Sequence, residues 1–129
     1  MIAGTDFIMA PSSKVQEICV GLRPGVATVS EIEEIEAQCA LDRAVCLVCD
    51  DGAVVISLDP LGEGRFELFL WLGVAFRHGA FERQEAALQA IARDLGAETI
   101  SFLPRRKGWA RRLGPQWRYR GQQLVRSVV

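Results

Sequence analysis

The sequence predicts an α/β domain built on a mixed sheet, and three observations lead to this prediction. Two almost continuous apolar segments, residues 67–72 and 99–103, flank an amphipathic stretch at residues 81–95. Apolar strands separated by a helix are typical of a parallel βαβ unit that is buried on both faces. Upstream, Asp50-Asp51-Gly52 separates two further apolar runs and favours a hairpin turn. The length of 129 residues predicts one domain, residues 1–129.

The first part of the chain predicts one short strand and two surface helices. Residues 6–11 form the strand, which Pro11 closes. Ser12-Ser13 offers an N-cap for a helix that extends to Leu22. A second helix begins at Ser30, with acidic residues near its positive end and with Ile32, Ile35 and Cys39 on one face.

Three strands follow as an antiparallel meander at residues 44–49, 53–58 and 65–72. Residues 59–64 read as a loose loop before the third of these strands, which also opens the βαβ unit. After residue 103 we expect a short helix at 107–113 and a last extended segment at 117–128, which Gly121 can divide. The predicted order is therefore β-α-α-β-β-β-α-β-α-β, with six to seven strands in the sheet.

Charge is distributed unevenly along the chain. Up to Glu98 there are 16 acidic residues and seven basic ones, whereas the residues from Thr99 onward include eight basic residues and no acidic one. Two interpretations stay open. The basic end can bind an anionic partner such as nucleic acid, or it can fold against the acidic remainder of the domain. The residues that would contact nucleic acid are Arg105, Arg106, Lys107, Arg111 and Arg112.

The four cysteines predict neither disulfides nor a metal site. Cys46 and Cys49 have the C-x-x-C spacing of some metal sites, but they lie in an apolar strand, where residues three apart point to opposite faces. The sequence has no secretion signal at its N-terminus and no apolar run long enough to span a membrane. We therefore expect a cytoplasmic protein without a membrane partner.

The order of elements resembles the GNAT acyltransferase superfamily over nearly the whole chain. A local match supports the resemblance, because residues 108–114 with the following Trp117 are similar to the family's late helix. In that family, main-chain N–H groups at the start of the central helix bind the pyrophosphate of acetyl-CoA through a Q/R-x-x-G-x-G/A pattern. The resemblance implies that the cofactor would be bound by Val74, Arg77, Gly79 and Ala80, with Arg105 and Arg106 nearby. Glu82 stands where the pattern has its last small residue.

The same resemblance implies a glutamate on the central strand as general base and a tyrosine in the late helix as general acid. Glu67 is the candidate base, with a solvent-facing surface residue as the alternative interpretation. His78 is a second catalytic candidate because an imidazole titrates near neutral pH. The late helix offers Arg111 or Arg112 instead of tyrosine, and Tyr119 falls in the following strand, where we expect it to pack.

Because the cofactor loop and the tyrosine both depart from the family pattern, we expect a non-catalytic interaction or assembly module without a bound cofactor. Small members of this kind are encoded by bacteriophages, where some are virion proteins, and the sequence resembles those. Protein partners or self-association would follow. Two alternatives stay open: an acetyl-CoA-dependent N-acetyltransferase with an atypical cofactor loop, and a nucleic-acid-binding module.

Overall fold

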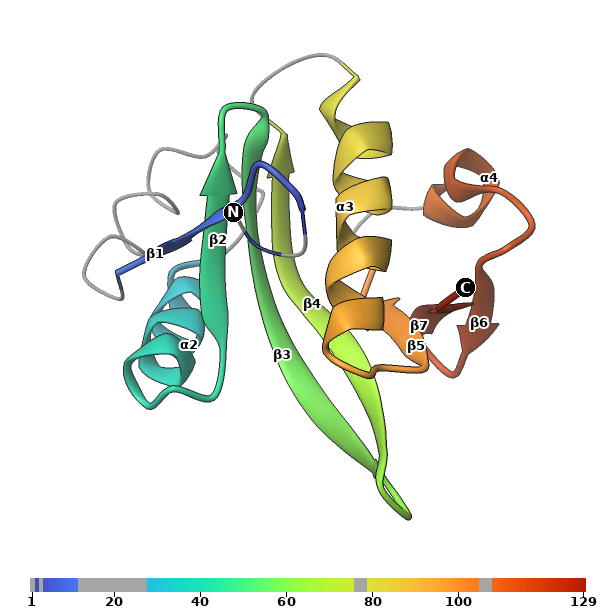
Figure 1. The fold of residues 1–129 in the computed structure, drawn as a ribbon, viewed down its shortest axis with the longest axis horizontal. Coiled ribbons are helices and arrows are strands. Elements are labelled where there is room, and N and C mark those ends of the chain that lie inside the picture. Colours follow the sequence, from blue (N-terminus) through green and yellow to red (C-terminus); the bar gives the residue numbers. More distant parts are fainter. Residues whose placement is uncertain (1, 3, 12–27, 76–78, 105–107) are drawn as a thin grey trace.

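A computed structural model describes residues 2, 4–11, 28–75, 79–104 and 108–129, and it has one seven-stranded sheet in the order β1-β2-β3-β4-β5-β7-β6 (Figure 1). Only β4 and β5 are parallel, so the predicted mixed α/β fold is confirmed. The first predicted helix, from Ser12 to Leu22, lies outside the described residues. The strands are β1 (Ile8–Ala10), β2 (Val45–Cys49), β3 (Gly52–Gly62), β4 (Arg65–Ala75), β5 (Thr99–Phe102), β6 (Arg118–Arg120) and β7 (Gln123–Ser127). The helices are α2 (Val29–Ala40), α3 (Ala80–Asp94) and α4 (Trp109–Leu113).

Strands β2, β3 and β4 form the predicted antiparallel meander, but β3 is longer than expected. It continues through Pro60 to Gly62, and the connection to β4 is a tight turn at Glu63-Gly64. The predicted loop at residues 59–64 is therefore wrong for most of its length. Proline fits here because the pairing of β3 with β2 stops at Ile56, opposite the first residue of β2, so that beyond this point β3 pairs only with β4 among the described strands.

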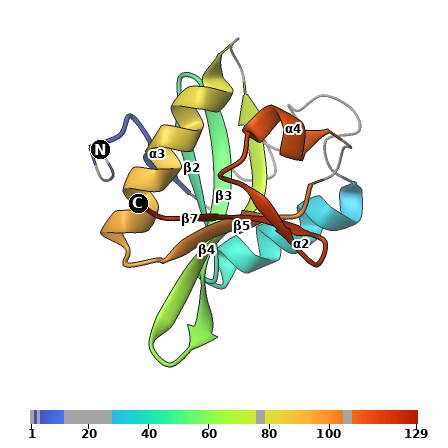
Figure 2. The same cartoon turned by 90° about the vertical axis from the view of Figure 1, so that its right-hand side faces the viewer.

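The two longer helices lie on opposite faces of the sheet (Figures 1 and 2). On one face, Leu88, Ile91 and Ala92 of α3 pack in a core with residues of β3, β4, β5 and β7. On the other face, Ile35 and Cys39 of α2 pack in a second core cluster with residues of β2, β3 and β4. The spacing of apolar residues at three and four positions puts these side chains on one stripe of each helix.

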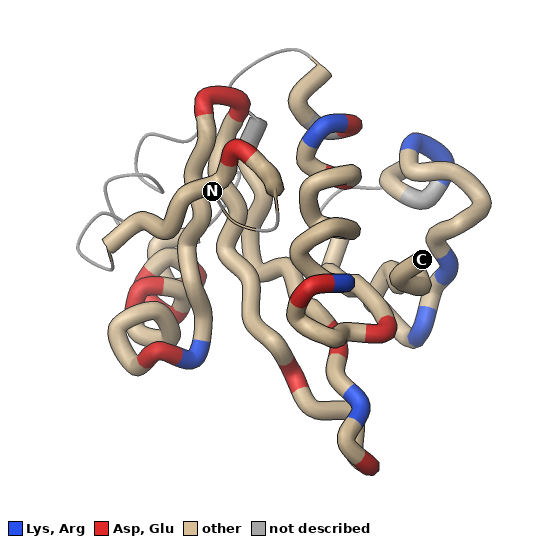
Figure 3. The backbone as a smooth tube through the Cα atoms, viewed as in Figure 1, with Lys and Arg blue, Asp and Glu red and all other residues tan. Residues whose placement is uncertain are grey.

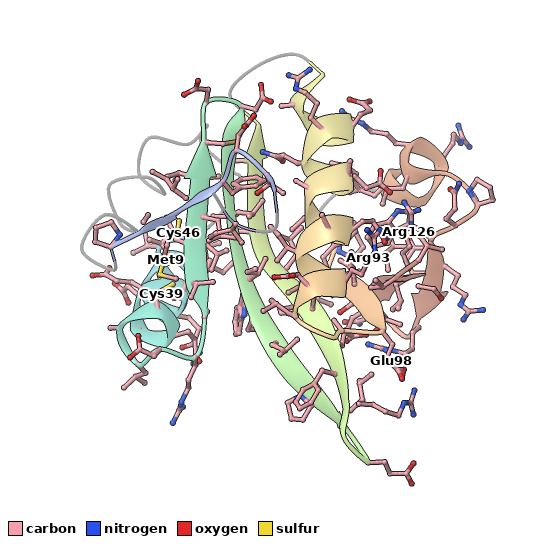
Figure 4. All side chains as sticks on the ribbon, viewed as in Figure 1. Met9, Cys39, Cys46, Arg93, Glu98 and Arg126 are labelled. Atoms are coloured by element: carbon pink, nitrogen blue, oxygen red, sulfur yellow. The ribbon has the colours of Figure 1, made fainter. Side chains whose placement is uncertain are left out.

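The C-terminal part adds β6 and β7 at the edge of the sheet beyond β5. The turn at Gly121-Gln122, where Gly121 has a φ of 63°, divides the two strands as predicted. Strand β7 lies between β5 and β6 and is antiparallel to both. Its residue Arg126 points toward α3 and forms an ion pair with Glu85 (Figure 4).

Acidic and basic residues occupy different regions of the fold. Figure 3 shows acidic residues along α2 and basic residues around α4 and β6. Two arginines of the basic end nevertheless form ion pairs with acids of the preceding part, Arg120 with Glu67 and Arg126 with Glu85. For these two arginines, the interpretation that the basic end folds against the acidic remainder is confirmed. No helix within the described ranges is both long enough and apolar enough to cross a membrane.

Candidate active site

A β-bulge interrupts β4 at Trp71, in the middle of the sheet. Val55 of β3 pairs with Leu72 and Ile56 pairs with Leu70, which leaves Trp71 without a partner on β3. A bulge of this kind bends its strand and increases the local twist. The Trp71 indole N–H donates a hydrogen bond of 2.9 Å to Ser57 Oγ, so the side chain of the bulged residue is fixed in place.

Strand β5 accompanies β4 over only four residues. The parallel pairing runs from Glu67 with Thr99 to Leu70 with Phe102, and β4 then continues from the bulge to Ala75. In this part β4 pairs with β3 on one side and with no described strand on the other. Figure 2 shows β4 rising toward the start of α3 while β5 runs across it. Main-chain groups on that side of β4 can therefore hydrogen-bond to an extended ligand, as an edge strand does.

The first turn of α3 lies next to the end of β4. Gly79 is its N-cap, with a φ of 75° and no side chain to cap the helix, and Ala80 is fully buried. Gln84 Nε2 donates a hydrogen bond of 2.8 Å to the Val74 carbonyl and joins the helix to the strand. The main-chain N–H groups of this turn carry partial positive charge and favour anions. Val74, Gly79 and Ala80, three of the predicted cofactor-binding residues, are thus brought together.

Four other predicted site residues lie outside the described part of the chain. These are His78, predicted as catalytic, and Arg77, Arg105 and Arg106, predicted to bind the cofactor. Their roles stay predictions.

Charged side chains flank the start of α3. Glu82 is exposed in the first turn, so the acidic residue that departs from the family pattern is on the surface. Arg83 forms an ion pair with Asp51, with Arg83 Nε 2.6 Å from Asp51 Oδ2. The hydrogen bond to Asp51 raises the pKa of Arg83 above its ordinary value. This pair joins the helix start to the turn between β2 and β3.

Glu67 is buried, with a relative exposure of 4%, so its interpretation as a solvent-facing residue is wrong. Thr99 Oγ1 donates to Oε1 at 2.7 Å and Ser101 Oγ donates to Oε2 at 2.8 Å. Arg120 adds one hydrogen bond to each oxygen, at 2.9 and 2.7 Å. Burial alone would raise the pKa of Glu67, but the hydrogen bonds from Arg120, Thr99 and Ser101 outweigh it and lower the pKa. The carboxylate is therefore held in its ionised form.

The partners of Glu67 were not predicted from the sequence. Thr99 and Ser101 alternate on β5, and this spacing places both hydroxyls on one face, which is a signal that could have found them. Arg120 is 53 residues from Glu67 and reaches it across β7 and β5. A contact at this separation depends on the order of the strands, which the sequence pattern does not give.

Aromatic residues gather beyond the C-terminal end of β5. Phe102 makes edge contacts with Trp109 of α4 and with Trp117, at centroid distances of 6.1 and 5.4 Å. The guanidinium of Arg112 lies 5.2 Å from the centre of the Trp109 ring. Arg111 and Arg112 are exposed, and their predicted contacts with nucleic acid or a protein partner stay predictions. Tyr119 is 58% exposed, so the expectation that it packs is wrong.

Comparison with solved structures identifies the fold as GNAT-like. The chain resembles a GNAT family acetyltransferase from Brucella melitensis, solved in complex with acetyl-CoA, with a TM-score of 0.61 and 17% identity over 94% of this chain and 87% of that one. It also resembles N-acetylglutamate synthase from Neisseria gonorrhoeae, complexed with coenzyme A and L-arginine (TM-score 0.61, 20% identity, 95% of this chain and 32% of that one). A GNAT family protein from Desulfovibrio desulfuricans matches over 95% of this chain and 98% of its own length (TM-score 0.61, 16% identity). No protein-family model and no curated protein matches the chain.

This comparison contradicts the prediction of a non-catalytic interaction or assembly module. Two of the three similar structures contain acetyl-CoA or coenzyme A, and none of the three is named as a virion protein. The expectations that the chain is not an enzyme and has no cofactor receive no support from it. The physical reason is that Glu82 and the missing tyrosine are changes of side chain. The bulge, the edge of β4 that continues beyond β5 and the start of α3 are features of the main chain, and they are present.

Proposed function

We propose that the chain binds acetyl-CoA between β4 and the first turn of α3 and transfers the acetyl group to an amine. One observation carries this proposal: β5 ends opposite Leu70, just before the bulge at Trp71, so β4 continues with one edge unpaired by any described strand and leads to the uncapped start of α3. An open strand edge and a helix N-terminus are complementary to the two parts of this cofactor, an amide-containing chain and a diphosphate.

The residues present fit the cofactor at both places. Gly79 and Ala80 are small, which lets a phosphate approach the main-chain N–H groups of the first turn. The side of β4 beyond Leu70 that has no described strand can hydrogen-bond to the amides of the pantetheine arm. Glu82 opposes an anion, but it is exposed in the first turn, where water and salt weaken its repulsion.

Each part of the site has a separate task. The first turn of α3 would hold the diphosphate, and β4 would orient the thioester near the bulge at Trp71. When bound, acetyl-CoA supplies an acyl group that is activated toward attack by an amine. The chain itself has to position the two reactants and accept a proton from the amine.

The proposal is tested by isothermal titration calorimetry with acetyl-CoA and a pair of matched variants. Gly79→Asp places a carboxylate at the helix start and should weaken acetyl-CoA binding at least tenfold. Gly96→Asp is the control, because Gly96 lies just beyond the other end of α3 and has nearly the same φ, 78° against 75°. Both substitutions put the same charged side chain on a residue with a positive φ, and only the first lies at the proposed phosphate site, where the added Cβ would also lie 3.3 Å from Arg83 Nη1.

Saturable binding by the unchanged chain, weakened by Gly79→Asp and not by Gly96→Asp, would support the site. Absence of binding at millimolar acetyl-CoA would refute the proposal. Equal weakening by both variants would show that the effect comes from helix stability. Melting temperatures of both variants, recorded without ligand, separate that case from a local effect.

A further inference from the structure

We infer that Asp59, and not its cross-strand neighbour Glu67, is the general base of this site. The inference rests on the proposed function and names the group that takes the proton. Asp59 on β3 and Glu67 on β4 are direct cross-strand partners. Two carboxylates therefore lie side by side in the sheet, and their surroundings assign them different tasks.

Both carboxylates are on the sheet face opposite α3. Ser57 and Asp59 are two residues apart on β3, and Ser57 Oγ donates a hydrogen bond of 2.7 Å to Asp59 Oδ1. Ser57 in turn accepts the hydrogen bond from the Trp71 indole, so Asp59 is linked to the bulged residue of β4. Glu67 precedes Phe69 by two positions, and the Phe69 ring contacts Trp71 on this same face.

Glu67 has no capacity left for a substrate proton. A carboxylate offers about four acceptor positions, and four donated hydrogen bonds reach Glu67, two on each oxygen. Two of them come from Arg120, whose positive charge favours the ionised form. The bonds of Glu67 hold Arg120 of β6 in place across β7 and β5.

Asp59 has the opposite surroundings. It is half-buried, it accepts one hydrogen bond, and that bond comes from the neutral hydroxyl of Ser57. Within the described ranges no Lys or Arg lies in ion-pair distance of Asp59, and no donor reaches its second oxygen. The chain of hydrogen bonds from Trp71 holds one oxygen in place and leaves the other open. A general base needs this combination of fixed position and free acceptor.

The proton transfer balances with acetyl-CoA and a protonated primary amine as reactants. Asp59 Oδ2 accepts one proton of the ammonium group, directly or across one water molecule. The freed nitrogen lone pair attacks the thioester carbonyl carbon, so that a C–N bond forms and the C–S bond breaks. The leaving sulfur takes a second proton from nitrogen, which gives the CoA thiol and an N-acetylated amine. Asp59 then releases its proton to solvent.

The test compares Asp59→Asn with Glu63→Gln in the full chain. Asparagine has the shape of aspartate and keeps an oxygen for Ser57, whereas Glu63→Gln removes an exposed carboxylate from the turn of the same hairpin. The assay mixes acetyl-CoA with n-butylamine, spermidine and lysine and measures CoA release by chromatography, which separates CoA from the cysteine thiols of the chain itself. Calorimetry gives the Kd for acetyl-CoA, and thermal melting gives Tm.

We expect Asp59→Asn to lower the rate about 100-fold, as loss of a general base does, with Kd unchanged within twofold and Tm within about 2 °C. Glu63→Gln should match the unchanged chain in all three measurements. A rate for Asp59→Asn within threefold of the unchanged chain overturns the inference. The inference is also overturned if the unchanged chain binds acetyl-CoA but releases no CoA with any of the amines. In that case the proposed acetyl-CoA site itself still stands. Failure to bind acetyl-CoA refutes the proposed function itself.

Discussion

Replacing Glu67 by glutamine is the most informative perturbation of the stability of this domain. Glutamine keeps the size of the side chain and can still contact Thr99 and Ser101, but it removes the negative charge that faces Arg120. The variant therefore leaves the guanidinium without its counter-ion. The effect on stability can be worked out from the exposure of the two partners.

Breaking a fully buried ion pair costs about 3–5 kcal/mol, because the remaining charge is uncompensated. Here the Glu67 side chain is 5% exposed but the Arg120 side chain is 48% exposed, so water can solvate part of the released guanidinium. Discounted for this screening, we expect a loss of about 2–3 kcal/mol. A 129-residue domain loses about 4 °C of melting temperature per kcal/mol. The predicted decrease in Tm at pH 7 is therefore about 8–12 °C.

The pH dependence gives an independent check. Because the pKa of Glu67 is lower in the folded chain than its ordinary value of 4.5, its contribution is complete above that value and is lost as the pH falls through the lowered pKa. Glutamine does not titrate, so the difference in stability between the two proteins should narrow below pH 4.5. The double variant Glu67→Gln/Arg120→Gln should regain part of the loss, because it removes the unpaired charge. A Tm at pH 7 within 2 °C of the unchanged chain, or a difference that is the same at pH 7 and pH 4, would refute this reasoning.

Two further predictions use the same unfolding measurements. Gly52→Ala should destabilise the domain by more than about 3 kcal/mol, because the added carbon would lie 1.9 Å from the Val74 carbonyl oxygen and the backbone would have to shift. In the control Gly121→Ala the added carbon meets nothing within 4 Å, so this variant should lose only about 1–2 kcal/mol through the strain of its positive φ. Equal losses of stability in the two variants would contradict this prediction. Arg65→Ala removes the ion pair with Glu98 and should leave Tm within about 2 °C of the unchanged chain, because both side chains are well exposed. A decrease in Tm as large as that of Glu67→Gln would show that exposure does not decide the strength of these ion pairs.

Most of the fold follows from local patterns of the sequence. The apolar runs on either side of α3 predict the parallel pair β4 and β5, and Asp50-Asp51-Gly52 predicts the hairpin between β2 and β3. The turn itself is Asp50-Asp51, because Gly52 pairs with Cys49 and is the first residue of β3, without the positive φ expected of a turn glycine. The extension of β3 through Pro60 does not follow from local patterns. Proline is tolerated there because the pairing of β3 with β2 has already stopped at Ile56. The length of a neighbouring strand is a property of the sheet and not of the residues around Pro60.

The candidate site was predicted only in part. Val74, Gly79 and Ala80 were identified because they are close in sequence and match a family pattern. The sequence pattern does not identify three other residues, because strand pairing brings them to their partners. Asp59 and Arg120 lie beside Glu67, and Ser57 bonds to Trp71. The predicted function was wrong for a related reason. The side chains that depart from the family pattern do not remove the main-chain groups at the bulge and at the helix start.

The position of β7 has a consequence for synthesis of the chain. Residues Gln123–Ser127 come after β6 in the sequence but lie between β6 and β5 in the sheet. Until they leave the ribosome, β5 has an unpaired edge and β6 has no neighbour, and a nascent chain that exposes a strand edge is open to aggregation. A premature stop after Gly121 would therefore do more than remove β7. It would leave the partly built sheet with the edge of β5 exposed and with Glu85 deprived of its ion-pair partner Arg126.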